Sequence, residues 1–520
     1  MKIMPHTSPN GWTATLELTR PCLDDNRADA DRLRAALAET FGAESVDIDI
    51  ALLRQLPEKL RQWDYTLRCL CFNDYGRWRL TGIKSADDPT PFVGLAVDLG
   101  TTRVVLRLIN LDSGETIQER AFDNPQIEVG PDILTRIHFA DEEGGLERLN
   151  DLIISGIQFN AEAVCREAGL AAEDVCLMAV SGNTSMVHLF MHLSPAAIIR
   201  EPYIPAVNRP GLISAAALDL KFHPGAGVFV FPNVGSYFGG DLISGILYSR
   251  IHESEAIAML VDVGTNAEVV LGSRDWLVAC AGAAGPALEG GVSPIGMTAG
   301  PGVIDQVAID PEGGDFDIHT ISDEPPKGIC GSGMIDLVAQ LFLSGLLDIR
   351  GRLVPDAAPD RIYESDEGRR LIVVHAEESA TGEDLTIGQA DFDSLIRSKA
   401  AMYTILETIT RYVGVGFGDI SRFYVAGTFG SFIRPRSAIN IGMIPDLPEE
   451  TYQSLGNSSL GGAARLLCDN AAVSAVERIH QNITYLELNV NQEFMNRFSA
   501  AKFLPHTEAA HFPSVKRYVN

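Results

Sequence analysis

The chain has 520 residues, and its 41 lysines and arginines against 69 aspartates and glutamates give a formal net charge of −28. At about 100–200 residues per domain, this length predicts about three to five domain-sized units. A hydrophobic content of 46% excludes a disordered chain, and the acidic balance argues against binding to nucleic acid or an anionic membrane, which needs a basic face. Eight cysteines are too few for a disulfide scaffold.

The sequence has no evident targeting signal. Its first residues, MKIMPHTSPNGW, have no apolar core of the kind that signal peptides carry. No stretch approaches the roughly 18 consecutive apolar residues that a transmembrane helix needs. We therefore expect a cytoplasmic protein.

Residues 1–90 are predicted to form a small, separate α+β domain. Alternating and helical hydrophobic patterns indicate strands at 12–18, 65–72 and 78–83 and helices at 26–40 and 51–61. The polar, proline-containing segment SADDPTP (85–91) is the predicted boundary with the next domain.

A strand–turn–strand–turn–strand pattern occurs twice in the remaining chain. The first copy has strands at 93–97, 104–111 and 115–121, with the turn DLGTT at 98–102. The second copy has strands at 258–261, 267–271 and 276–280, with the turn DVGTN at 262–266. The leading aspartates, Asp98 and Asp262, are 164 positions apart. An interval of this size predicts two duplicated domains, at 91–255 and 256–520, rather than a short-repeat solenoid.

The segments between and after these hairpins are rich in predicted helix. Amphipathic or apolar patterns predict helices at 145–168, 331–347 and 391–413. The last of these carries an apolar side, made by Leu395, Met402, Ile405, Leu406 and Ile409. A short buried strand at 423–426 leads into the glycine loop GTFG at 427–430.

The residues that most often bind metals are scattered. Cys69 and Cys71 lie two positions apart on a predicted strand, a pattern that favours a buried strand face over a metal site. His188 and His192 are four positions apart, but the glutamate of a zinc-binding helix and a third ligand are missing, so we favour a structural role. Because no C-x2-C or four-cysteine ferredoxin spacing occurs, we predict no iron–sulfur cluster in this chain.

The two D-x-G-T turns have the composition of phosphate-binding turns. Glycine leaves room for a phosphate to approach the backbone, and the amides and hydroxyls that follow donate hydrogen bonds to its oxygens. The leading aspartates suit Mg²⁺. A single turn of this kind is weak evidence, because tight turns use the same residues for conformational reasons. Two copies in matching strands, with the glycine loop at 427–430 for a nucleoside, predict a site that clamps a nucleoside triphosphate from both sides.

These motifs make the chain similar to the superfamily of actin, sugar kinases and heat-shock chaperone ATPases. AVDLGTT (96–102) resembles its first phosphate motif, LVDVGTN (260–266) its second and YVAGTFG (424–430) its adenosine motif. The glycine cluster KGICGSGMIDL (327–337) lies where that superfamily places a connecting helix and hinge.

Within the superfamily, the chain resembles one branch, the reductive activators of corrinoid proteins. Residues 1–90 resemble the small middle domain of that family, notably at LDDN (23–26). From about residue 93 the resemblance is carried by NPQ (124–126), DILTRI (132–137), SGNTSMVHLF (181–190), PNVGSYFGGD (232–241), DVGTNAEVVL (262–271), GAAGPALEGG (282–291), GNSSLGGA (456–463) and FLPHTE (503–508).

The resemblance implies an α/β fold with two duplicated RNase-H-like lobes of the actin-like ATPase type, preceded by a small α+β domain. It implies an ATPase that uses ATP and Mg²⁺ to help return a Co(II) corrinoid to Co(I), the state competent for methyl transfer. The implied partner is a corrinoid protein or corrinoid-dependent methyltransferase. Family members usually carry an iron–sulfur domain, which we do not find, so we expect a separate ferredoxin-like electron donor. We expect no nucleic-acid or membrane partner, and we also consider a homodimer.

The resemblance assigns roles to individual residues. Asp98 and Asp262 are expected to organise Mg²⁺ and the attacking water, and Glu268, two strand positions from Asn266, could act as the base or be a solvent-facing glutamate. Asp241 could be a Mg²⁺ ligand or a helix N-cap. The residues expected to hold phosphates are Gly100, Thr101, Thr102, Gly264, Thr265 and Asn266, and those expected to line the nucleoside are Gly427, Thr428 and Gly430.

Some residues and functions keep alternatives open. Asn183 and Thr184 could reach the site from the end of a strand or form a plain turn, and Lys399 is more typical of a solvated lysine than of a nucleotide contact. Two other functions are compatible with the same ATP clamp. One is a small-molecule kinase, and the other is a nucleotide-switched binding protein without a redox role.

Overall fold

The computed structural model describes residues 11–236, 238–264, 266–283, 293–310, 315–427, 434–487 and 492–517. The chain divides into two compact units, each described by itself below. Unit 1 comprises Met1–Arg250 and Ser458–Asn482, and unit 2 comprises Ile251–Asn457 and Ile483–Asn520. Among the described residues, no helix has the length and hydrophobicity that a bilayer crossing requires.

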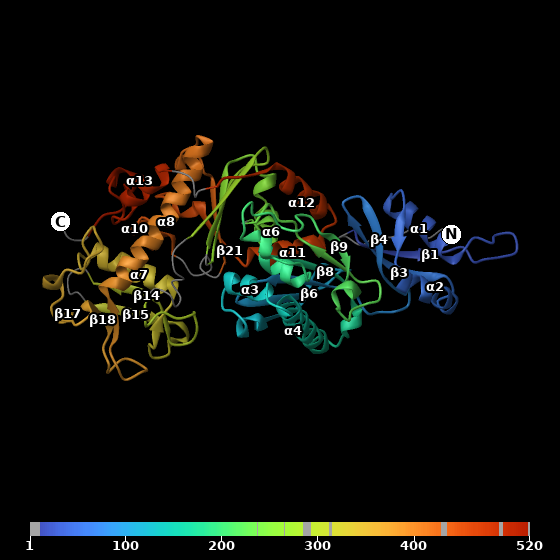
Figure 1. The fold of residues 1–520 in the computed structure, drawn as a ribbon, viewed down its shortest axis with the longest axis horizontal. Coiled ribbons are helices and arrows are strands. Elements are labelled where there is room, and N and C mark those ends of the chain that lie inside the picture. Colours follow the sequence, from blue (N-terminus) through green and yellow to red (C-terminus); the bar gives the residue numbers. More distant parts are fainter. Residues whose placement is uncertain are drawn as a thin grey trace. The chain divides into compact units, whose positions relative to one another are not determined.

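The N-terminal part of unit 1 is a small α+β fold, as the alternating patterns predict (Figure 1). Its four-stranded sheet has the order β1-β3-β4-β2, with strands β1 (Thr13–Glu17), β2 (Val46–Ile48), β3 (Thr66–Asp74) and β4 (Arg77–Ser85). Helices α1 (Asp29–Phe41) and α2 (Ile50–Gln62) bury their leucines against it. Cys69 and Cys71 are fully buried in this core, which supports the structural interpretation of both thiols.

The small fold is docked onto the rest of unit 1. Lys84 on β4 pairs with Asp174 at 3.1 Å, and the rings of Phe72 and Phe229 lie 5.6 Å apart. The segment predicted as a boundary is also tied down, because Arg68 donates to the carbonyls of Asp88 and Thr90, both at 2.9 Å. The polar joint is therefore not a free linker.

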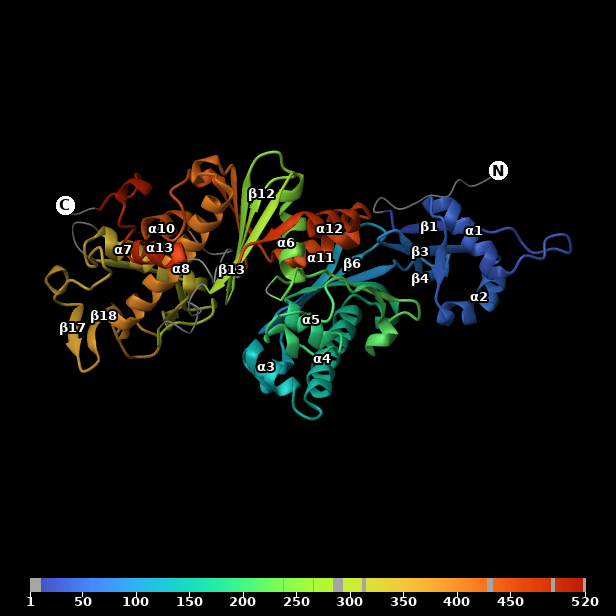
Figure 2. The same ribbon diagram turned by 45° about the horizontal axis from the view of Figure 1, so that its top comes forward.

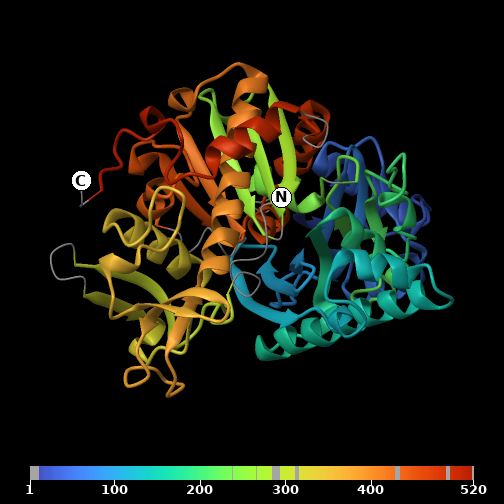
Figure 3. The same ribbon diagram turned by 60° about the vertical axis from the view of Figure 1, so that its left-hand side comes forward.

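The larger sheet of unit 1 has the order β7-β6-β5-β8-β10-β9. Its strands are β5 (Val93–Leu99), β6 (Arg103–Asn110), β7 (Thr116–Asp123), β8 (Val175–Gly182), β9 (Gly211–Ser214) and β10 (Gly227–Val230). The first three form the predicted antiparallel meander, and β8 and β10 extend it in parallel from β5. Between β7 and β8 lie helices α3 (Ile133–Ala140) and α4 (Gly145–Glu167), and helix α5 (Thr184–Phe190) follows β8. Helix α4 packs along β6 and β7 (Figure 3).

Unit 2 repeats this topology. Its main sheet has the order β21-β20-β11-β12-β13-β22, with strands β11 (Ala258–Val263), β12 (Asn266–Gly272), β13 (Leu277–Ala283), β20 (Arg422–Ala426), β21 (Tyr452–Gly456) and β22 (Ile483–Tyr485). The strands β11, β12 and β13 form the second antiparallel meander, and β20 and β21 extend it in parallel from β11. The predicted fold class, α/β with duplicated RNase-H-like lobes and a small N-terminal α+β domain, is confirmed.

Two smaller sheets and several helices complete unit 2. The sheets are β15-β14-β16 and β17-β18-β19, with strands β14 (Val303–Ile309), β15 (Phe316–Thr320), β16 (Gly328–Ile329), β17 (Ile362–Ser365), β18 (Gly368–Val374) and β19 (Leu385–Gly388). The helices are α7 (Gly331–Leu343), α8 (Gln389–Val413), α10 (Pro435–Asn440) and α13 (Gln492–Ala501). Helix α8 packs against β12 and β13 on one side and against α13 on another.

The C-terminal part of the chain returns to unit 1 for two helices. Helices α11 (Ser458–Cys468) and α12 (Ala471–Asn482) pack against α6 (Gly240–Ser249), which follows β10 (Figure 2). The predicted domain limits at 90 and 255 stay predictions, but α11 and α12 fall in a predicted second lobe while packing in unit 1.

The α6–α11 contact depends on two adjacent glycines. A Cβ atom on Gly462 would lie 2.0 Å from the carbonyl oxygen of Ser244, and one on Gly461 would lie 2.7 Å from the ring of Tyr248. Real Cβ contacts are not that short, so only glycine allows the two helix backbones to approach this closely.

The expectation that Lys399 is a solvated lysine is wrong. It is fully buried rather than solvated. Its Nζ donates to the carbonyls of Phe503 at 2.6 Å and Pro505 at 2.7 Å. Burial lowers the pKa of Lys399 well below its usual value. The side chain therefore fastens the C-terminal segment onto α8.

We expect Gly462→Ala to destabilise the protein by about 1–3 kcal/mol, because the added methyl forces α11 away from α6. The gain in helix propensity from alanine is smaller, about 1 kcal/mol. Thermal or urea denaturation measures the effect. Gly418→Ala is the control, since a Cβ there meets nothing within 4 Å. Equal stability of the two variants would contradict the close packing.

We expect Lys399→Met to loosen the segment around residues 503–505, because two buried carbonyls lose their donors. At about 1 kcal/mol per hydrogen bond, amide hydrogen exchange in this segment should accelerate roughly tenfold or more. Arg397→Met, at an exposed position of the same helix, should leave the exchange unchanged. Unaltered exchange in Lys399→Met would show that the lysine does not hold the segment.

Candidate functional site

The first predicted turn lies at the end of β5. Asp98 is half-buried and stands opposite Ser181 of the parallel strand β8. The turn that follows is held from two sides: Asn124 donates through Nδ2 to the carbonyl of Gly100 at 2.9 Å, and Asn183 donates to the hydroxyl of Thr101 at 3.1 Å. The local fold therefore fixes the backbone of residues 100–101 beside Asp98, whereas Thr102 is exposed.

Asn183 therefore contacts the first predicted turn. This agrees with the interpretation that it reaches the site from the end of a strand, rather than forming a plain turn. Its side chain also accepts the amide of Met186 at 3.0 Å, which caps α5 and fixes its orientation. Thr184 is buried and donates to the carbonyl of Gly235 at 3.3 Å, so it supports the loop before α6 instead.

Asp241 lies in the first turn of α6, next to the same strand ends. The N-cap position belongs to Gly239, so the N-cap interpretation of Asp241 is wrong. Its Oδ1 accepts the amide of Leu242 at 2.9 Å. A Cβ on Gly239 would lie 2.4 Å from Asp241 Oδ1 and 2.5 Å from the Cα of Asn183, so only glycine lets these two groups approach. The proposed role of Asp241 in Mg²⁺ binding stays a prediction.

The second predicted turn lies at the end of β11. Asp262 is half-buried and stands directly opposite Glu268 on β12 and Ala426 on β20. Because paired residues of neighbouring strands share a face of the sheet, the carboxylates of Asp262 and Glu268 lie on the same face. The role of Glu268 as a base stays a prediction.

Gly427 completes this part of the site. It has a φ of +83°, a left-handed conformation that favours glycine, and a Cβ there would lie 2.8 Å from both Asp262 Oδ1 and the carbonyl of Val263. Gly264 is exposed at the turn. Thr265, Thr428, Gly430 and the side chain of Asn266 lie outside the described residues.

The donor set fits a magnesium nucleotide. The predicted ligands are carboxylate oxygens, which Mg²⁺ prefers, and the backbone that lies closest to Asp262 Oδ1 is a glycine, Gly427, where a Cβ would lie 2.8 Å from that oxygen. Within the described ranges no group of three His, Cys, Asp or Glu side chains forms a ready-made metal site. Mg²⁺ typically takes one or two protein carboxylates and completes its shell with phosphate oxygens and water, so these turns suit it only together with nucleotide.

Sequence reasoning missed two serines at the first turn. Ser459 on α11 donates to Asp98 Oδ1 at 2.7 Å, and its Oγ lies 2.9 Å from the Oγ of Ser181. Ser459 is 361 positions from Asp98 in the sequence. The adjacent glycines that follow it, Gly461 and Gly462, were the available signal for a closely packed helix.

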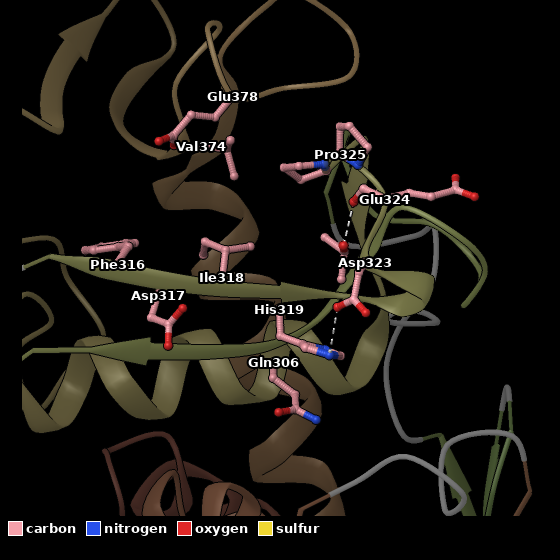
Figure 4. Close-up of a pocket in the computed structure, with 12 residues that line it drawn as sticks. Gln306, Phe316, Asp317, Ile318, His319, Asp323, Glu324, Pro325, Val374 and Glu378 are labelled. Atoms are coloured by element: carbon pink, nitrogen blue, oxygen red, sulfur yellow. Dashed lines mark hydrogen bonds and ion pairs between the residues drawn. The ribbon is translucent and has the colours of Figure 1, made fainter.

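A pocket of about 690 Å³ lies elsewhere in unit 2 and contains none of the predicted site residues (Figure 4). Its walls come from β14, β15 and the segment with Pro325, and they carry Asp317, Asp323, Glu324 and Glu378. His319 lies in it, 2.6 Å from Asp305, and this hydrogen bond raises the pKa of His319. The acidic lining does not suit a polyanionic nucleotide.

His188 and the buried thiols have structural surroundings. His188 Nε2 accepts the amide of Ala206 at 3.0 Å, which leaves Nδ1 to donate to the carbonyl of Thr184 at 2.7 Å, and burial lowers the pKa of His188. Burial raises the pKa of the Cys165 and Cys176 thiols to about 12. All eight cysteines are free, and the thiolate form that a metal needs is disfavoured at Cys165 and Cys176.

Known proteins match this chain over most of its length. A curated relative, the corrinoid activation enzyme RamQ of Eubacterium limosum, is 29% identical over 424 residues, which are 80% of this chain and 71% of that protein. The [Co(II) methylated amine-specific corrinoid protein] reductase of Methanosarcina barkeri is 23% identical over 78% of this chain and 75% of its own length.

A solved structure has the same fold. The reductive activator for corrinoid,iron-sulfur protein superposes with a TM-score of 0.85 at 37% identity, covering 97% of this chain and 80% of that one. The resemblance drawn from the motifs is thereby confirmed.

Three family models match consecutive parts of the chain. Residues 6–89 match the RACo linker region, residues 93–254 the RACo middle region, and residues 256–516 the C-terminal domain of RACo, which is the ASKHA domain. The family thus gives the name middle region to residues 93–254, not to the small domain at 1–90 for which we expected it. Two duplicated sheets with aspartate turns, a docked small domain and matches along almost the whole sequence lead to one conclusion: this chain belongs to the RACo family.

Proposed function

We propose that this protein is an ATP-dependent activator that assists the reduction of a Co(II) corrinoid to Co(I) in a corrinoid methyltransferase system. The observation that carries the proposal is the pair of aspartate turns at equivalent strand ends of two duplicated sheets, in a chain of the RACo family. The names of the curated relatives and of the matched solved structure support corrinoid activation as the task.

The proposed ATPase residues follow from the two turns. Asp98 and Asp262 orient Mg²⁺ and the attacking water, Asp241 is a third carboxylate for the metal, and Glu268, opposite Asp262, accepts a proton from the water. The phosphates are held by Gly100, Thr101, Thr102, Gly264, Thr265 and Asn266, and the nucleoside by Gly427, Thr428 and Gly430. When bound, Mg²⁺ neutralises charge on the phosphates. Hydrolysis joins the water oxygen to the γ-phosphorus and breaks its bond to the β–γ bridging oxygen, giving ADP and phosphate.

The overall charge of the protein constrains how it binds ATP. With a net charge of −28, the overall field of the protein does not attract a polyanion. Backbone amides and hydroxyls of the glycine turns are the donors that suit the phosphates, and the carboxylates require the metal between themselves and the nucleotide.

The proposed partners are a corrinoid protein or corrinoid-dependent methyltransferase and a separate ferredoxin-like donor. One electron passes from the donor to Co(II), giving Co(I), and ATP supplies the free energy that this uphill step needs. The cysteine spacing supports a separate donor, because it contains no ferredoxin pattern. Eight free thiols are compatible with action in the reducing cytoplasm. A homodimer stays a prediction.

The activity test combines purified protein with MgATP, a low-potential reductant and a corrinoid protein. We expect the Co(I) absorbance to develop only with ATP. Asp98→Asn and Asp262→Asn should each lower ATP hydrolysis by about 100-fold or more, as loss of a group that orients metal and water does. Asp366→Asn, in the exposed turn between β17 and β18, is the control. Phosphorylation of a small acceptor would favour the kinase alternative, and full partner function without hydrolysis would favour the binding-protein alternative.

We expect Gly427→Ala to weaken nucleotide binding by about tenfold or more, since the methyl enters the space beside Asp262 Oδ1 and strains a left-handed residue. Calorimetry with a non-hydrolysable ATP analogue measures this. Gly414→Ala is a matched control, because Gly414 has nearly the same φ of +82° but a Cβ there meets nothing within 4 Å. Equal affinities of the two variants would show that crowding at Asp262 does not matter.

A further inference from the structure

We propose that Ser459 is a positioning residue for Asp98: its hydroxyl, delivered by helix α11, holds the Asp98 carboxylate in the orientation that Mg²⁺ and nucleotide need. This inference rests on the proposed ATPase function and assigns a residue to it from outside the phosphate motifs.

The protons of the two serine hydroxyls define a directed chain that ends on Asp98. An ionised carboxylate only accepts hydrogen bonds, so the single hydroxyl proton of Ser459 goes to Asp98 Oδ1 at 2.7 Å. The Ser459 oxygen can then accept from Ser181, at 2.9 Å. The alternative acceptor for Ser181, the carbonyl of Gly240, is longer at 3.2 Å. Ser181 therefore strengthens the bond that Ser459 donates.

The donor is rigidly placed. Ser459 is 6% exposed and Ser181 is fully buried, so water does not readily replace either hydroxyl. The carbonyl of Ser459 accepts from the hydroxyl of Ser244 on α6 at 2.7 Å. The contact of Gly462 with Ser244 holds α11 against the same turn of α6. A hydrogen bond from a fixed donor to one carboxylate oxygen sets the orientation of both oxygens.

The same arrangement reaches the second candidate metal ligand. Helix α6 begins at Gly240, whose carbonyl faces Ser181, and Asp241 is the next residue. Ser459 thus contacts the helix that carries Asp241, through the hydroxyl of Ser244, as well as the side chain of Asp98.

Ser459 also follows closely in the sequence after the sheet that carries the other aspartate, Asp262. In the main sheet of unit 2, Asp262 stands opposite Ala426 and Ala426 stands opposite Gly456. The chain then passes from unit 2 to unit 1 between Asn457 and Ser458. Ser459, whose hydroxyl donates to Asp98, therefore follows only three residues after Gly456, which is aligned with Asp262 across the sheet.

The test uses the full chain and measures Mg²⁺-dependent binding of a non-hydrolysable ATP analogue by calorimetry, with ATP hydrolysis as a second readout. Ser459→Ala should raise the Mg²⁺ concentration for half-maximal nucleotide binding about tenfold, as loss of a hydrogen bond to a charged group predicts. It should lower kcat more than it raises KM for ATP. Ser459→Cys places a larger atom and a weaker donor at the same position and should lie between wild type and Ser459→Ala.

Two controls separate positioning from stability. Ser249→Ala removes another buried hydroxyl on α6, which bonds only to the carbonyl of Ile246 in the described contacts, and should leave the Mg²⁺ dependence within about twofold of wild type. Ser181→Ala should shift it in the same direction as Ser459→Ala but less, and the double variant should equal Ser459→Ala because Ser181 acts through Ser459.

Wild-type Mg²⁺ dependence in folded Ser459→Ala, or in Ser459→Cys and Ser181→Ala if the alanine variant does not fold, would overturn the positioning role. Additive effects of Ser181→Ala and Ser459→Ala would overturn the directed chain. Absence of Mg²⁺-dependent nucleotide binding by the wild-type protein would instead contradict the proposed ATPase function, so the two failures are distinguishable.

Discussion

Parallel pairing of the aspartate strands is the interaction on which the candidate site depends. In each main sheet, the strand that carries the aspartate pairs with a parallel neighbour, β5 with β8 and β11 with β20. Parallel strands end at the same edge of a sheet, so each aspartate lies beside the chain that leaves its neighbour. At β8 that chain supplies Gly182 and Asn183, and at β20 it supplies Gly427. The glycines matter because these strand ends leave no space for a side chain.

The local parts of this arrangement can be predicted from sequence, and the long-range parts cannot. Asp98 and Asp262 are recognisable because strand, turn and return strand are consecutive in the sequence, at 93–111 in the first copy and 258–271 in the second. Ser459 is not recognisable, because nothing near it in the sequence indicates that α11 packs against β5 and β8 instead of the sheet it follows. Asp241 shows an intermediate case: its place at the start of α6 is predicted, but Gly239 rather than Asp241 takes the N-cap position.

Lys399 shows why hydrophobic periodicity fails in the interior of a large unit. The apolar positions predicted for α8, such as Leu395 and Ile405, are buried as expected. Several of its polar residues, such as Lys399 and Thr404, are buried too, since β12 and β13 cover one side of the helix and α13 with the C-terminal segment covers another. A helix covered on several sides keeps only a narrow solvent face, so a lysine that lies outside that face must find carbonyl partners.

The return of α11 to the first unit also affects how this protein can be divided or recombined. Helix α6 is apolar and buried along most of its length, and much of its cover is α11, which is made only after the whole of β11 to β21. A fragment ending before Ser458 would expose the face of α6 that α11 covers, and it would lack the Ser459 hydroxyl that donates to Asp98. During synthesis, likewise, the first unit cannot reach its final packing until Asn482, of 520 residues, has left the ribosome. Exchange of a whole lobe between relatives would therefore have to carry residues 458–482 with the first unit.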